Sequence, residues 1–172
     1  MKLTGIILAA IIILSIAVVA AFAIAGPTRV WSLFGPADLG PVTFEQLERR
    51  ATPNDALACP ADLCKARSDM LSPRFAVDAR VLRAAMEKIL ATEPNVTRVA
   101  ADEATRTERF VQRSARLGFP DTIVVRYLEQ PGERSTLAIY SRSQLGRSDL
   151  GANRERIARW LKKLAQQAPV AE

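Results

Sequence analysis

The chain of 172 residues is long enough for one domain and a short extra segment. It contains no histidine, which excludes Ser-His-Asp and Cys-His hydrolases and histidine-bound metal sites. The net charge of +6 favours anionic partners, but only 6% of the residues are aromatic and the basic residues are spread along the chain, so we expect no nucleic-acid partner.

The first element is an almost unbroken apolar run, Leu3–Ala25, that carries no charge. A helix of about 20 apolar residues crosses a bilayer core, so residues 1–25 are predicted to be a transmembrane anchor. Lys2 precedes the run and favours an orientation with the N-terminus inside and the rest exported. The small-x-small sequence that ends at Ala25 is typical of a signal-peptide cleavage site, which stays the alternative; the length of the run favours a retained anchor.

Residues 26–73 are predicted to be an irregular segment because proline fixes φ and lacks an N–H donor. Cys59 and Cys64 are the only cysteines of the chain, and in an exported protein we expect them to form a disulfide, with free or exchanging thiols as the alternative. Six of the ten prolines lie in this segment: Pro27, Pro36, Pro41, Pro53, Pro60 and Pro73.

Residues 74–168 are predicted to form an α+β domain with a small antiparallel four-stranded meander sheet and two main helices packed on one face. The first helix is Asp78–Thr92, with Asp78 as its cap. The other face of the sheet would carry Arg109, Arg113, Arg126 or Tyr140, depending on register. It is expected to be solvated, with a basic binding surface as the alternative. The predicted strands are Thr97–Ala101, Thr105–Ser114, Thr122–Glu129 and Arg134–Arg142.

The stretch Ser141–Ile157 is predicted to be a corner that leads from the last strand into the second helix. Gly146 permits the positive φ that a sharp turn needs, and Ser148 or Asp149 would cap the helix. The apolar face of this helix consists of Ile157, Trp160, Leu161 and Leu164. Its basic residues are predicted to lie mostly off that face: Arg154, Arg156, Arg159, Lys162 and Lys163.

Two interpretations of this corner stay open. In the first, a helix N-terminus and converging basic side chains bind an anion. In the second, the corner is structural, and Gly146, Asp149 and Gly151 only shape and cap it. The candidate anion-binding residues are Arg142, Arg147, Asn153 and Arg154.

Two motifs carry a resemblance to a known family. The corner sequence RSQLGRSDLGANRERI, together with PNDALACPADLC at Pro53–Cys64, resembles the bacterial family named domain of unknown function 1499 over about Pro53 to Leu164. The resemblance implies a small domain of bacteria that is often membrane-tethered or exported. It implies no activity and no catalytic residues.

These observations leave two hypotheses for the function. The first is an accessory or binding domain, held at the bacterial inner membrane by Leu3–Ala25, that faces the periplasm and binds an anionic small molecule or lipid of the envelope. The second is a hydrolase that works without histidine. Because the carboxylates are scattered and the chain has no GxGxxG or GxxxxGK[ST] phosphate loop, we expect no catalytic residues, no metal and no cofactor; no protein partner is indicated.

Overall fold

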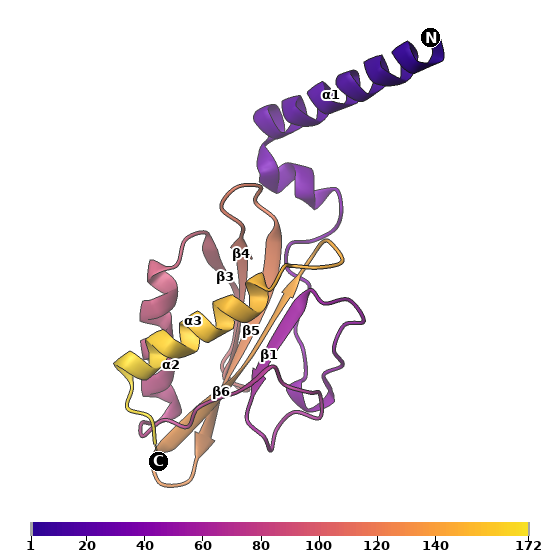
Figure 1. Cartoon of the computed structure of the whole chain (residues 1–172). Coiled ribbons are helices and arrows are strands. Elements are labelled where there is room, and N and C mark those ends of the chain that lie inside the picture. The colour runs from indigo at the N-terminus through magenta and orange to yellow at the C-terminus, as the bar shows by residue number, and fades with distance from the viewer. Residues whose placement is uncertain (1, 172) are drawn as a thin grey trace. The chain divides into compact units, whose positions relative to one another are not determined.

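The computed structural model describes residues 2–171, which divide into two units on either side of the bond between Pro36 and Ala37 (Figure 1). The first unit contains α1 (Lys2–Ser32), whose helical backbone is interrupted at Gly26 (φ 76°, ψ 159°). The most apolar window of α1 is entirely unburied within the structure. By length and composition, α1 could cross a membrane as an anchor or serve as a signal segment.

The second unit is an α+β domain built on one six-stranded mixed sheet with the order β2-β1-β6-β5-β4-β3 (Figure 1). Neighbouring strands are antiparallel except β1 and β2, which are parallel. The strands are β1 (Asp55–Cys59), β2 (Met70–Leu71), β3 (Val96–Asp102), β4 (Thr107–Arg113), β5 (Pro120–Gln130) and β6 (Arg134–Ser143). The helices are α2 (Ala79–Thr92), α3 (Ala152–Gln167) and the short 3₁₀ helix η1 (Phe44–Gln46).

The predicted antiparallel meander is confirmed for β3 to β6, but the predicted number of four strands is wrong. The two additional strands come from the segment 26–73, which we expected to be irregular because of its prolines. Pro53 and Pro60 lie just outside β1, so neither removes an N–H group from the ladder between β1 and β6. The apolar residues between them are therefore free to pair as a buried strand.

One face of the sheet is covered by α2 and α3, which share its apolar core. The predicted helical periodicity is confirmed, since Leu82 and Met86 of α2 and Trp160 of α3 are completely buried. The cap is confirmed as well, because the carboxylate of Asp78 accepts a hydrogen bond from the N–H group of Val81 (2.8 Å). The strands supply alternate side chains to this core: Ile123, Val125, Tyr127, Leu137 and Ile139.

The opposite face is not solvated, contrary to the expectation from the sequence. Residues 37–50, which we call the strap, cross it and bury Phe44 against Tyr140 and other apolar residues. Arginines of the sheet hold the strap in place. Arg109 pairs with Asp38 (2.7 Å) and Arg126 with Glu45 (2.7 Å), while Arg142 donates to the carbonyl groups of Leu39 and Gly40, both at 2.8 Å.

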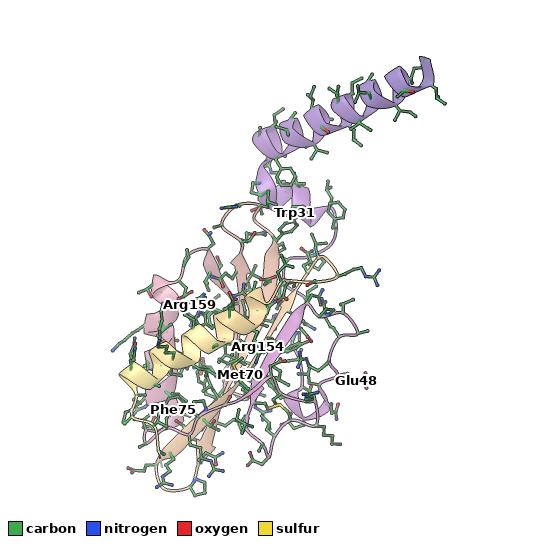
Figure 2. All side chains as sticks on the ribbon, viewed as in Figure 1. Trp31, Glu48, Met70, Phe75, Arg154 and Arg159 are labelled. Atoms are coloured by element: carbon green, nitrogen blue, oxygen red, sulfur yellow. A yellow bond between two sulfur atoms is a disulfide. The ribbon has the colours of Figure 1, made fainter. Side chains whose placement is uncertain are left out.

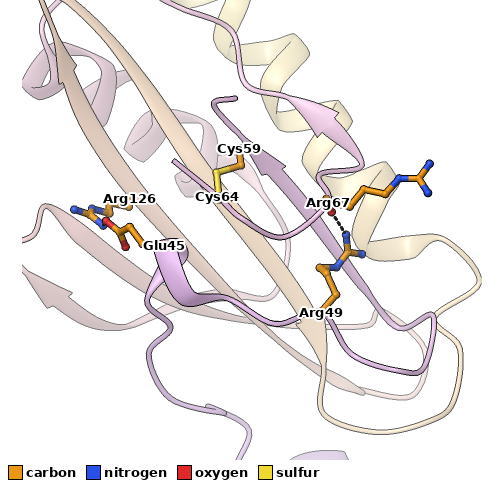
Figure 3. The surroundings of a disulfide bond; sticks show 6 residues. All are labelled: Glu45, Arg49, Cys59, Cys64, Arg67 and Arg126. Carbon is orange, nitrogen blue, oxygen red and sulfur yellow. Dashed lines mark hydrogen bonds and ion pairs between the residues drawn. A yellow bond between two sulfur atoms is a disulfide. The ribbon is translucent and has the colours of Figure 1, made fainter. Parts of the chain in front are cut away.

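The disulfide between Cys59 and Cys64 closes a small loop directly after β1, with the two Cα atoms 6.2 Å apart (Figure 3). Beside it, Arg49 at the end of the strap pairs with Asp55 (2.8 Å) and donates to the carbonyl oxygen of Arg67 (2.9 Å). A loop this short restricts the unfolded chain by only about 2 kcal/mol. The disulfide and Arg49 therefore anchor a segment that has little core of its own.

Glu93, the residue after α2, joins the two helices. Its carboxylate, 3% exposed, accepts bonds from Lys163 (2.6 Å) and Arg159 (3.0 Å) of α3. Burial by itself would raise the pKa of Glu93, but the bonds from Lys163 and Arg159 outweigh it and lower the pKa from 4.5 to about 2. The ionised carboxylate is therefore favoured by folding.

We expect Glu93→Gln to remove part of the acid sensitivity of the domain. A lowered pKa means that the stability contributed by Glu93 is complete above pH 4.5 and is lost as the pH falls toward about 2. The variant should be less stable than the wild type at neutral pH and should lose less stability over this window. Urea unfolding at a series of pH values, followed by circular dichroism, measures the difference. Glu155→Gln, at an exposed position of α3, is the control, and an unchanged pH profile in Glu93→Gln would contradict the assignment.

Candidate functional site

The two sequence motifs meet in the structure at the end of the sheet where β6 leads into α3. The side-chain amide of Asn54 donates to the carbonyl oxygen of Gly146 (2.6 Å), and the carbonyl oxygen of Asn54 accepts from the N–H group of Ser143 (2.9 Å). The N–H group of Asp149 donates to the carbonyl oxygen of Pro53 (3.4 Å). Pro53 and Asn54 of the upstream motif therefore stabilise the turn that the corner motif forms.

The turn itself has the shape that its glycines indicate. Gly146 (φ 87°) and Gly151 (φ 86°) adopt positive φ, a region that glycine enters without strain. Leu150 (φ 54°), between Asp149 and Gly151, also has positive φ. Of the two predicted caps, Asp149 accepts the N–H group of Asn153 in the first turn of α3 (2.9 Å) and that of Gly151 (3.0 Å). The three residues predicted to shape the corner therefore lie in it together.

Asn153, one of the candidate anion-binding residues, is completely buried and fully used inside the protein. Its amide donates to Asp149 (2.7 Å) and Ser143 (3.0 Å), and its carbonyl oxygen accepts from Ser141 (2.5 Å) and Arg156 (2.6 Å). No donor of this side chain is left for a ligand, since an amide has two N–H groups. Asn153 is a structural residue of the corner.

Arg156 is the central residue of the corner, and the sequence analysis missed it. Its guanidinium is buried and donates to Asp121 (2.6 Å), Ser141 (2.8 Å) and Asn153 (2.6 Å), and also to Gln112. Arg156 was expected to lie mostly off the apolar face because of its charge. The helical spacing did contain the signal, because positions 153 and 156 continue the row of buried positions 157, 160, 161 and 164.

The three candidate arginines do not converge as expected. Arg142 points to the face of the sheet that the strap covers, over the ring of Tyr140 at 5.8 Å, and burial lowers its pKa. Arg147 in the turn and Arg154 on α3 (Figure 2) are exposed. Because α3 packs on the other face, the sheet separates Arg142 from Arg154. Anion binding by Arg147 and Arg154 stays a prediction.

A cavity of about 280 Å³ lies at the corner, between the β4–β5 loop and the β6–α3 loop. Two carboxylates line it, but neither is free. Asp121 is held by Arg156, and Asp149 by the three N–H groups of Gly151 and Asn153. The remaining walls are small or apolar: Ser114, Phe119, Pro120, Ser143, Leu145, Gly146, Ser148, Leu150 and Ala152.

This arrangement is poorly suited to acid–base chemistry. A general base needs a lone pair directed at the reacting group, whereas these carboxylates already accept bonds from the protein. Within residues 2–171, no group of three or more Cys, Asp or Glu side chains is placed to hold a metal ion. The corner therefore presents an apolar cavity, and Arg147 is exposed on the turn that forms part of its wall.

Comparison with known proteins gives one result for the family. The model of the family described as "Protein of unknown function (DUF1499)" matches residues 46–164, which include both motifs and all six strands. The search of curated proteins finds no match. The match begins inside the strap and ends within α3, so it covers the sheet, α2, most of α3 and the corner.

We expect the pair of Arg156 and Asp121 to be coupled. Arg156→Met should cost about 3–5 kcal/mol of unfolding free energy, because it leaves the carboxylate of Asp121 buried without its partner. Asp121→Asn should also destabilise, and the double variant should cost less than the sum of the two. Urea unfolding followed by circular dichroism measures all three. Arg154→Met, exposed on the same helix, is the control and should cost about 0.5 kcal/mol or less; strictly additive costs would contradict the coupling.

Proposed function

We propose that this chain, which belongs to the family of proteins of unknown function DUF1499, is an anchored binding domain that faces the periplasm. Membership of the family brings no activity, so the proposal rests on α1 and on the corner. Its substance is that the domain holds an anionic component of the cell envelope close to the membrane, without converting it.

The observation that carries the proposal is the exposure of the apolar side chains of α1. Large apolar side chains of this helix, such as Leu3 (71% exposed), Ile13 (68%) and Ile24 (87%), have no apolar core to pack against within the described residues. Exposure of so many of them to water is unfavourable, and a bilayer removes that cost. Lys2 before the apolar run favours export of the domain, and the disulfide of Cys59 and Cys64 suits an oxidising compartment.

The anionic character of the ligand is supported by the charges at the corner. Arg147 lies between two residues that line the cavity, Gly146 and Ser148, and its side chain is exposed. Arg154 is exposed in the first turns of α3, where the helix dipole also favours a negative charge. An anion at the rim of the cavity would meet Arg147, Arg154 would add positive charge at the start of α3, and the apolar walls would accept an attached apolar group.

One observation favours the alternative of a hydrolase without histidine. Asp121 and Asp149 line the same cavity, as a pair of catalytic carboxylates would. The hydrogen bonds that both accept from Arg156, Gly151 and Asn153 weigh against this role, because an acid or base must exchange protons with a substrate. We therefore favour binding.

Reporter fusions test the topology. An alkaline phosphatase fused to the C-terminus should be active, because the domain is exported, and a reporter that works only in the cytoplasm should be silent at the same position. The fusion should stay in the membrane fraction at full length. Loss of about 25 residues would indicate a cleaved signal peptide, and the opposite reporter pattern would reject the proposal.

Thermal unfolding of the detergent-solubilised full chain tests the anionic ligand. Glycerol phosphate, the soluble headgroup part of an anionic lipid, should raise the melting temperature, since a ligand at about 100 times its dissociation constant adds about 2.7 kcal/mol. Arg147→Ala and Arg154→Ala should respond less. Arg134→Ala, exposed at the start of β6, is the control and should respond like the wild type. Equal responses in all four proteins would show that the corner is not the site.

A further inference from the structure

We infer that the corner end of the domain, defined as the loops at residues 114–119 and 143–150, docks on the surface of an anionic bilayer with Leu150 inserted among the lipids. The inference rests on the proposed anchor and goes beyond it. An anchored domain could project freely into the periplasm, whereas here one named surface would lie against the membrane. Four features of the domain and its connector support the inference.

The first feature is the point where the chain enters the domain. The hydroxyl group of Thr122 donates to the carbonyl oxygen of Ala37 (2.9 Å) and accepts the N–H group of Leu39 (3.0 Å). Thr122 lies near the start of β5, two residues after Pro120, which lines the corner cavity. The domain is therefore attached to its anchor at the corner end of the sheet.

The second feature is the length of the connection. From Gly26, where the helical backbone of α1 is interrupted, residues 27–32 rise about 9 Å as a helix, and the five further steps to Ala37 reach at most about 18 Å. The turn between β5 and β6 lies at the other end of the 11-residue strand β5, about 36 Å from the corner. The short connection therefore keeps the corner end close to an anchor at α1, while the hairpin turn is free to lie further away.

The third feature is an apolar side chain held out in solvent. Leu150 is 93% exposed, the highest value among the exposed large hydrophobic residues of the structure, although it is part of the rim of the apolar cavity. Its backbone is fixed, because its N–H group donates to the hydroxyl group of Ser148 (3.2 Å) and the adjacent Asp149 is held by α3. Leu117, on the neighbouring loop, is 51% exposed.

The fourth feature is the charge of the same end. Arg116 and Arg147 are exposed on the two loops, and Arg154 is exposed on the first turns of α3. The exposed carboxylate of the same turns of α3 is that of Glu155, so positive charge prevails here. Arginines beside an inserted leucine are the combination that binds the surface of a bilayer with anionic lipids.

Depth-dependent quenching tests the docking on the reconstituted full chain. Both native cysteines are in the disulfide, so Leu150→Cys and Glu133→Cys each offer one thiol for a fluorophore. In vesicles of phosphatidylcholine and phosphatidylglycerol with brominated acyl chains, the label at position 150 should be quenched about twofold or more, and the label at 133, in the hairpin turn, should not. Vesicles of phosphatidylcholine alone, or high salt, should reduce the quenching. Equal quenching at both positions, or none at 150, would overturn the inference.

A second measurement separates insertion from a local change of fold. With the label at Ala115→Cys, an exposed position of the other corner loop, the added substitutions Leu150→Asp and Arg147→Glu should abolish the quenching while the circular dichroism spectrum stays the same. Persistent quenching would show that another surface contacts the lipids. Failure of the docking is distinct from failure of the proposed function. The docking is wrong if the phosphatase fusion is active and full-length but the label at 150 stays unquenched; the anchor itself is wrong if the fusion is inactive or cleaved.

Discussion

The position of the domain's second helix depends on one buried charge. The guanidinium of Arg156 has left water, and a charge in the interior is tolerated only when it is paired and hydrogen-bonded. Its partners come from three strands and from α3: Gln112 of β4, Asp121 of β5, Ser141 of β6 and Asn153 of α3. A shift of α3 by one turn, about 5.4 Å, would break this set. The same contacts orient Asn153, and through it the cap at Asp149 and the bond to Asn54, so the corner follows from Arg156.

The sequence predicts the parts of this protein that depend on periodicity. The buried rows of α2 and α3 and the antiparallel order of β3 to β6 follow from the spacing of apolar residues. The sequence does not predict what depends on distant partners. Strand β1 was missed because Pro53 and Pro60 flank it. The neighbouring sequence does not indicate that both prolines lie outside the hydrogen-bonded ladder. Arg156 was missed because its charge suggests a surface position until Asp121, 35 residues away, is known to face it.

The position of the strap also depends on distant partners and was not predicted from the sequence. Its residues have little regular structure and gain their place from arginines of the sheet, Arg109, Arg126 and Arg142. Arg109 and Arg126 were expected on a solvated or basic binding face, and Arg142 was a candidate for anion binding at the corner; all three instead bind the protein's own chain. The two family motifs are likewise used internally, since Asn54 and the turn at Gly146 hold each other. Hypotheses about the function therefore rest on the exposed features of the corner, namely Arg147, Arg154 and Leu150, and on α1.

The strap also determines how the domain responds to mechanical force. If α1 is held in a membrane as proposed, tension enters the domain at Ala37 and reaches the contacts of the strap one after another, beginning with Thr122 and then the pair of Arg109 and Asp38. The contacts of the strap would break one at a time, whereas separating two strands of the sheet requires many backbone hydrogen bonds to break together. Peeling would stop at Phe44, whose ring is 1% exposed beneath the strap. The seven residues 37–43 would then form an extended connection of at most about 25 Å while the sheet stays intact, so part of the domain's own chain is a reserve of linker length.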